Sequence, residues 1–188
     1  MATTLIDHQE LGSTTWDNSS TDKTIWQKGS IPNTYDHLLV IGSIRSASSA
    51  YWQNLWIRVG GVSDSGLDTG ARYSSTILST VNSGSPVSSN ATGQTKWAYQ
   101  YIAAATVLAD TFSTLKIWIP NYSNAANFKQ VIIQTAVENN VTNGAQWNLT
   151  QTAGLWADQE AITDIGVSEP NSGMIQYSSF TLYGITGA

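Results

Sequence analysis

The chain of 188 residues contains no cysteine, which excludes disulfide bonds, thiolate metal sites and cysteine nucleophiles. Charged residues are also scarce: Asp, Glu, Lys and Arg make up 11% of the chain, against roughly 25% in an average globular protein. Helical bundles and coiled coils need charged outer faces, so this composition argues against both classes. No apolar run approaches the roughly 18 residues of a membrane-spanning helix, and we expect no membrane partner.

Basic clusters are missing as well. The formal net charge is −5, and a surface of that sign repels the phosphate backbones of nucleic acids, so nucleic acid is not an expected partner. The first ten residues lack the basic and apolar regions of a signal peptide. We therefore expect synthesis in a cytoplasm without export by the usual route.

Hydrophobic residues are abundant, at 41%, and they include eight Trp and eight Tyr beside many Ser, Thr, Asn and Gly. Short alternating runs separated by turn-rich stretches are typical of strands. Leu55–Val59 alternates in this way. The run Leu115–Ile119 ends at Pro120, which has no backbone N–H to donate to a neighbouring strand. The eight predicted strands are His37–Ile41, Leu55–Val59, Tyr73–Leu78, Trp97–Ile102, Leu115–Ile119, Lys129–Val137, Ile162–Val167 and Phe180–Ile185.

The segments between these runs have turn and loop compositions, and the longest of them is Asn82–Gly93. No segment carries a sustained helical period. Consecutive strands without helices predict an all-β, antiparallel two-sheet sandwich of jelly-roll-like topology. We assign the sandwich domain to residues 30–188. Residues 1–29 form an N-terminal arm or edge strand, held either by the chain's own sandwich or by a neighbouring subunit.

Candidate catalytic residues are few. The two histidines, His8 and His37, have no G-x-S-x-G turn to accompany them in a serine-hydrolase site. Asp64 and Asp68 lie in one glycine-rich loop. The composition of this loop is typical of a turn, and the two carboxylates are also possible oxygen ligands for calcium. The loop lacks the D-x-D-x-D-G spacing of an EF-hand, so we assign no metal ligands there.

Paired carboxylates for glycoside hydrolysis are a second possibility, carried by Asp158, Glu160 and Asp164 beside Trp156. A glycosidase usually sets its two acids on facing strands across an aromatic cleft, and this cluster lies along one stretch of chain. We therefore expect no enzyme activity, no catalytic residue and no cofactor.

Tryptophan is the most informative residue type, because its ring serves in a core, at a subunit interface or as a platform for sugars. Trp56 and Trp118 fall on the strand face opposite the aliphatic residues, which favours an exposed or interface position. The candidate subunit or capsid interface comprises Leu5, Ile6, Leu11, Trp16, Trp56 and Trp118. The alternative candidates for stacking on a glycan are Trp52, Trp97 and Trp156.

One segment, SIPNTYDHLLV from Ser30 to Val40, resembles an I-P-x-x-Y-x-x-L-x-[VIL] run that opens the first core strand of virion proteins of tailed phages. The further matching segments, in chain order, are Arg45-Ser46, Ile119–Tyr122 followed by Lys129, Gly154–Trp156, Ala161–Ile165 and Ser178–Ile185. The resemblance covers about residues 5–186, nearly the whole chain.

This resemblance implies a jelly-roll virion component. The short chain has no shaft repeats, which departs from a typical tail fibre and favours a compact decoration, or cement, protein on the capsid surface. Such proteins are commonly trimers that bind the major capsid protein of the same virion. The alternative is a receptor-binding, adaptor or head-fibre module that contacts a host surface glycan. Both place the protein on the virion after its synthesis in the host cytoplasm.

Overall fold

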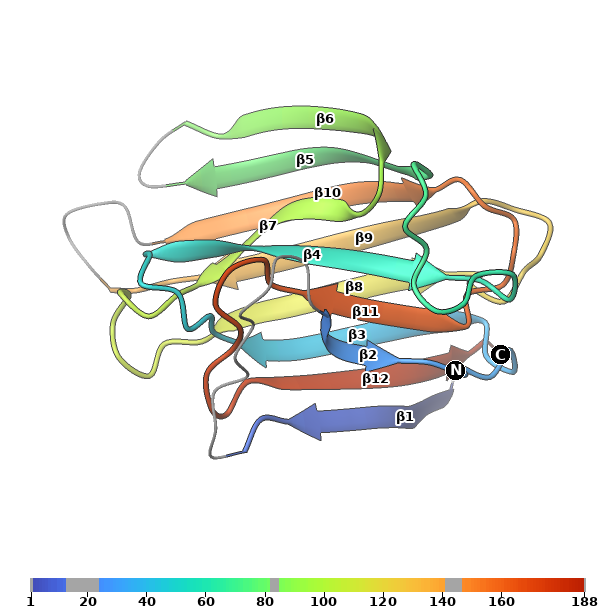
Figure 1. Ribbon diagram of the computed structural model, residues 1–188, viewed down its shortest axis with the longest axis horizontal. Coiled ribbons are helices and arrows are strands. Elements are labelled where there is room, and N and C mark those ends of the chain that lie inside the picture. The colour runs from blue at the N-terminus through green and yellow to red at the C-terminus, as the bar shows by residue number, and fades with distance from the viewer. Residues whose placement is uncertain (1, 13–23, 82–84, 141–146, 188) are drawn as a thin grey trace.

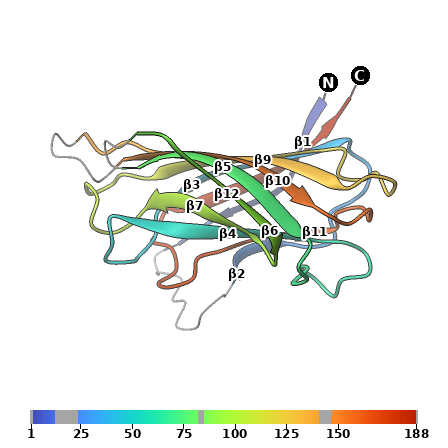
Figure 2. The ribbon, with the colours of Figure 1, turned by 90° about the horizontal axis from the view of Figure 1, so that it is seen from above.

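The computed structural model describes residues 2–12, 24–81, 85–140 and 147–187, and this part of the chain is all-β, with twelve strands and no helix. The strands form two antiparallel sheets that pack face to face as a sandwich (Figures 1 and 2). The predicted fold class is confirmed. Because the sheets differ in size, the larger one extends beyond the smaller at one side.

The larger sheet has eight strands and the smaller has four. In spatial order the larger sheet contains β1 (Ala2–Glu10), β12 (Ser179–Thr186), β3 (His37–Ile44), β8 (Ser113–Pro120), β9 (Lys129–Val137), β10 (Asn148–Trp156), β5 (Tyr73–Val81) and β6 (Val87–Gln94). The smaller sheet contains β2 (Thr24–Lys28), β11 (Asp164–Ser168), β4 (Trp52–Gly60) and β7 (Trp97–Ala103).

The chain crosses repeatedly between the sheets, since β1, β3, β8 and β12 lie in one sheet and β2, β4, β7 and β11 in the other. The resulting orders, β1-β12-β3-β8 and β2-β11-β4-β7, are consistent with a jelly roll. The hairpins β5-β6 and β9-β10 add four further strands to the larger sheet alone.

Alternation along the strands builds the core. Leu55, Ile57 and Val59 of β4 are fully buried, as their spacing predicts, and β8 repeats the pattern with Leu115, Ile117 and Ile119 on its inner face. Successive strand residues point to opposite faces, so one face of each sheet supplies the core.

The N-terminal residues are edge strands of the chain's own sandwich. Strand β1 pairs with β12 at the border of the larger sheet, and β2 pairs with β11 at the border of the smaller one. Leu11 follows β1 and is buried in the core, where its backbone N–H donates to Ser178. In the described part of this segment, β1 and β2 thus pack along the chain's own sandwich.

The prediction that Asn82–Gly93 is a loop is wrong for its second half, because β6 begins at Val87. Strands β2 and β10 were also missing from the prediction. In β10 the inward residues Asn148, Thr150 and Thr152 are polar yet buried. Hydrogen bonds join Thr152 to Gln100 and Thr150 to the Asn148 Oδ1 atom inside the sandwich. The inner face of β10 is therefore polar, and the strand shows no apolar alternation.

Tyr73 makes stability depend on pH in alkaline solution. Its hydroxyl donates to the Val59 carbonyl at 2.8 Å, and burial raises its pKa well above the ordinary 10.0. The unfolded chain loses this proton near pH 10 while the folded chain keeps it. The free energy of unfolding should therefore fall above pH 10, by up to about 1.4 kcal/mol per pH unit for this group. Denaturant unfolding at increasing alkaline pH measures the slope.

Tyr73→Phe should give a flatter alkaline slope than the unaltered chain, although the variant loses two hydrogen bonds to Val59 at every pH. Tyr177→Phe, at a tyrosine that is 63% exposed, is the matched control. An unchanged slope in Tyr73→Phe would show that this phenol is not the group responsible.

Candidate functional site

The outer face of the larger sheet carries a continuous row of apolar side chains across six neighbouring strands. Its members are Cα partners from strand to strand, in the order Leu5, Tyr183, Leu39, Trp118, Ile132 and Ala153. We call this set the outer apolar row. Leu5 is 57% exposed and Ile132 37%, whereas Tyr183, Leu39 and Trp118 are half-buried by their neighbours. The row presents an apolar band to solvent.

Charge is sparse beside this band. The adjoining cross-strand row contains Thr181, Ile41, Lys116, Gln134, Gln151 and Leu78. Lys116 is its one charged member, and Ile41 and Leu78 are exposed hydrophobic residues. The chain as a whole has a net charge of −5, whereas the one charged side chain of these two rows is a lysine.

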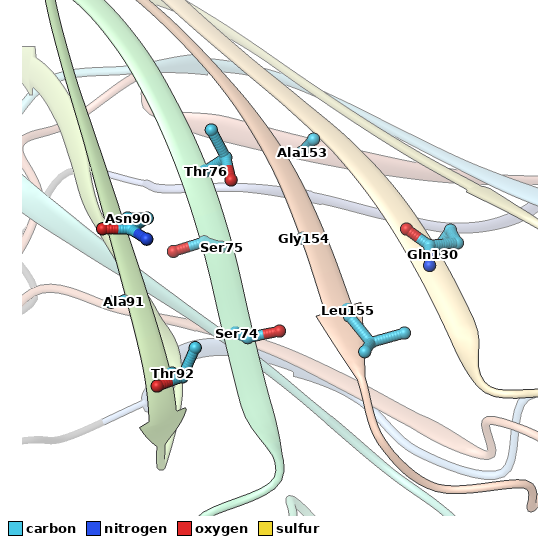
Figure 3. A pocket seen from close by; sticks show the side chains of 10 residues that line it. All are labelled: Ser74, Ser75, Thr76, Asn90, Ala91, Thr92, Gln130, Ala153, Gly154 and Leu155. Atoms are coloured by element: carbon cyan, nitrogen blue, oxygen red, sulfur yellow. The ribbon is translucent and has the colours of Figure 1, made fainter.

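At the β6 end the outer face becomes a shallow polar hollow of about 260 Å³ (Figure 3). Ser74 and Thr76 of β5, Asn90 of β6 and Gln130 of β9 supply hydroxyl and amide groups around it. Gly154 lies between them on β10 and contributes no side chain. The hollow contains no titratable group among the described residues, which suits neutral contacts rather than catalysis.

Two of the predicted glycan-stacking residues are in the core, and that prediction is wrong for them. Trp97 is fully buried with its ring edge against Tyr73, at 5.0 Å between centroids. Trp156 is fully buried, and its indole N–H donates to Asp68 Oδ2 at 2.7 Å. Neither ring is open to a sugar in solvent.

Trp52 and Trp56 are half-buried near the surface of the smaller sheet. The Trp52 ring makes an edge contact with Tyr101 at 4.6 Å, and Lys96 Nζ lies 3.3 Å from the centre of the Trp56 ring. A cation over an indole face is a stabilising contact. The ring of Trp56 therefore already has a partner within the chain.

The remaining interface candidates divide between surface and core. Leu5 and Trp118 belong to the outer apolar row, and Ile6 is half-buried against the core. Leu11 is 3% exposed in the core of its own chain, so the prediction of an interface role is wrong for that residue. Trp16 lies outside the described residues.

The loop and strand-end carboxylates gather around one cation. Arg72 Nη1 forms an ion pair with Asp158 and lies 3.7 Å from Asp68 and 4.0 Å from Asp64. Asp68 also receives the Trp156 indole N–H. These contacts hold the 61–72 loop against the segment after β10.

The same contacts argue against glycoside hydrolysis. Hydrogen bonds from Ser63 hold the pKa of Glu160 below its ordinary value, whereas a general acid needs a raised pKa. Asp158 is engaged by Arg72, and Asp164 accepts from Thr163 Oγ1 at 3.0 Å. In the described part of the chain, no group of three His, Asp or Glu residues is arranged to bind a metal ion.

Four of the segments that resemble phage virion proteins meet at one end of the sandwich. The Tyr122 hydroxyl donates to the Pro32 carbonyl, and the Ile162 N–H donates to the Tyr122 carbonyl at 3.0 Å. The Asp36 N–H donates to the Ile185 carbonyl at 3.0 Å. Four stretches that are far apart in the sequence thus form one hydrogen-bonded closure.

The opposite end is held by Arg45, which follows β3 and is 5% exposed. Its guanidinium donates to four backbone carbonyls of a single loop. The acceptors, with distances in Å, are Leu108 (3.0), Ala105 (3.1), Val107 (3.1) and Thr111 (3.4). Arg45 thereby orders the connection from β7 to β8.

Comparisons with protein-family models, with curated proteins and with solved structures return no match. Among the described residues there is no helix with the length and hydrophobicity needed to span a bilayer.

Proposed function

We propose that this protein is a structural component of a tailed-phage virion. Its role is that of a non-enzymatic decoration, or cement, protein that binds the outer surface of the head as an oligomer, commonly a trimer. Its partners are other copies of itself and the major capsid protein. The alternative role is that of a receptor-binding, adaptor or head-fibre module.

The observation that carries this proposal is the outer apolar row. An exposed apolar band with little charge marks a protein interaction surface on an otherwise polar molecule. The band runs over most of the width of the larger sheet, from Leu5 on β1 to Ala153 on β10. A face of this breadth suits a partner that is itself broad, as a capsid shell is.

Charge gives a second line of support. Two copies of a chain with a net charge of −5 repel one another over most orientations. The outer apolar row and its neighbouring row contain only Lys116 as a charged side chain. A face of this kind allows close contact between subunits, and repetition of the contact over a shell adds avidity.

The segments of the phage resemblance support the proposal in a more limited way. They include the closure around Tyr122 and the Arg45 contact with Ser178, whose hydroxyl accepts from the Arg45 N–H at 3.2 Å. The resemblance thus rests on residues that hold the sandwich together. It supports membership of a structural class, and the outer face supports the role.

Immunogold labelling of intact phage particles with an antibody against this chain tests the location. Gold over the head is the expected result. Gold confined to the tail would replace decoration by the receptor-binding alternative, and no gold on any particle would overturn both.

Ile132→Glu tests the surface. A carboxylate placed in the middle of the outer apolar row would be desolvated on docking, so binding of the purified chain to particles lacking it should weaken about a hundredfold or more. Sedimentation of particles with bound chain measures the affinity.

The matched control for this variant is Val62→Glu, which adds the same charge at an exposed apolar residue in the loop after β4, away from the larger sheet. It should bind as the unaltered chain does. Equal binding by Ile132→Glu would remove the outer apolar row as the docking surface.

A further inference from the structure

A second surface feature lies on the opposite side of the β5-β6 hairpin from the polar hollow. The hairpin extends the larger sheet past the border of the smaller one, where β7 is the edge strand (Figure 1). A groove of about 470 Å³ lies between hairpin and edge strand. Its walls include Ile77, Ser89, Asn90 and Gln94 of the hairpin and Tyr99 and Tyr101 of β7.

The backbone at Tyr99 is unusual. The register between β4 and β7 shifts between Leu55 and Ile57, and Tyr99 lies in the irregular stretch opposite, with a φ of 65°. A left-handed conformation is costly for a bulky residue. Bulges re-aim side chains and occur beside binding sites. Here the ring of Tyr99 lines the groove and is 52% exposed.

Tyr101 gives the groove a second, more fixed ring. It is half-buried, and its contact with Trp52 at 4.6 Å sets the orientation of the ring. Burial and the neighbouring Tyr99 hydroxyl both raise the pKa of Tyr101, so its hydroxyl remains protonated and able to donate at neutral pH. The two tyrosines thus offer ring faces and hydroxyl groups side by side.

The rest of the lining is uncharged. Gln94 and Ser89 supply amide and hydroxyl groups, and none of the described residues that line the groove is charged. The Gln94 amide is fixed by its bond to the Thr92 carbonyl at 2.9 Å. Aromatic faces with a few fixed polar groups are typical of small-molecule sites, and the volume lies in their usual range.

We propose that this groove binds a neutral carbohydrate chain, with a sugar ring against Tyr99 and its hydroxyl groups hydrogen-bonded to the neighbouring amides and phenols. A sugar has apolar C–H faces and many neutral hydroxyls, which this combination of side chains matches. An anionic ligand would find no cation in the groove. The groove is separate from the outer apolar row. The carbohydrate proposal and the proposed docking surface are therefore tested independently of one another.

The test is a titration of the ¹⁵N-labelled full chain with maltohexaose, cellohexaose and chitohexaose, followed by NMR. Amide signals of residues 87–101 should shift with at least one of them at or below about 10 mM, the weak end of specific recognition. Acidic oligogalacturonate should leave these signals unchanged. No shift with any neutral probe, or shifts confined to other parts of the chain, would overturn the proposal.

Tyr99→Ala should weaken binding of the responding probe about tenfold, and Tyr99→Phe should retain most of it because the ring remains. Tyr177→Ala is the matched control, since Tyr177 is also exposed and has a similar φ of 69° but lies outside the groove. Unchanged affinity in Tyr99→Ala, with its amide spectrum otherwise preserved, would contradict the assignment of that ring.

Discussion

Replacement of Arg45 by methionine should lower the free energy of unfolding by about 3–4 kcal/mol. The variant removes the hydrogen bonds that the guanidinium donates to four carbonyls of residues 105–111. Hydrogen bonds from a charged donor contribute more than neutral ones, and carbonyls left unpaired near the core add a desolvation cost. Urea unfolding followed by tryptophan fluorescence measures the change.

Arg45→Lys separates charge from geometry. An ammonium group has three donors on a flexible stem, so it can replace only some of the hydrogen bonds that the planar guanidinium donates to the carbonyls. The free energy of unfolding of Arg45→Lys should therefore lie between those of Arg45→Met and the unaltered chain. Lys116→Met, on the exposed face of β8, controls for removal of a positive charge and should change stability by no more than about 0.5 kcal/mol. Equal stability of Arg45→Met and the unaltered chain would show that residues 105–111 order themselves without the guanidinium.

Gly154→Ala should destabilise the chain by about 1–3 kcal/mol, because it overfills a tight contact between the sheets. A Cβ atom at this position would lie 2.5 Å from Trp97 Nε1 and 2.6 Å from Val131 Cγ1. Trp97 belongs to the smaller sheet, and Gly154 and Val131 belong to the larger one. The added methyl group would therefore disturb the packing of the two sheets against each other. Thermal unfolding followed by circular dichroism measures it.

Gly12→Ala is the matched control for this substitution, because no atom lies within 4 Å of the Cβ that it would add. It should leave stability within about 0.5 kcal/mol of the unaltered chain. A Gly154→Ala variant that is as stable as Gly12→Ala would mean that Trp97 relaxes at little cost.

The sequence predicts the strands whose inner faces are aliphatic, because burial of such residues leaves a period of two. The runs around Val40, Ile57 and Ile117 are of this kind, and all three residues are fully buried. Strands β6 and β10 escape prediction, since Ser, Thr and Asn occupy both faces of β6 and the buried face of β10. A buried pair such as Gln100 and Thr152, joined at 2.8 Å, looks the same in a sequence as two exposed polar residues.

The candidate binding residues were harder to predict. Trp97 begins a strand whose register is interrupted by the bulge at Tyr99, so alternation along β7 does not indicate which aromatic residues face outward. The outer apolar row depends on the pairing of strands that are distant in the chain. Only the strand order aligns Leu5 with Ala153, and composition alone does not reveal that order.

The positions of β11 and β12 have a consequence for the order in which the sheets assemble. Strand β12 lies between β1 and β3, and β11 lies between β2 and β4. Strand β1 therefore pairs only when β12 is in place, since Ala2 pairs with Thr186. Pairings of such high contact order form slowly, and before β11 and β12 insert, β1 and β2 have no partner strand while β3 and β4 each have one unpaired edge. We therefore expect insertion of β11 and β12 to be a late step that completes both sheets.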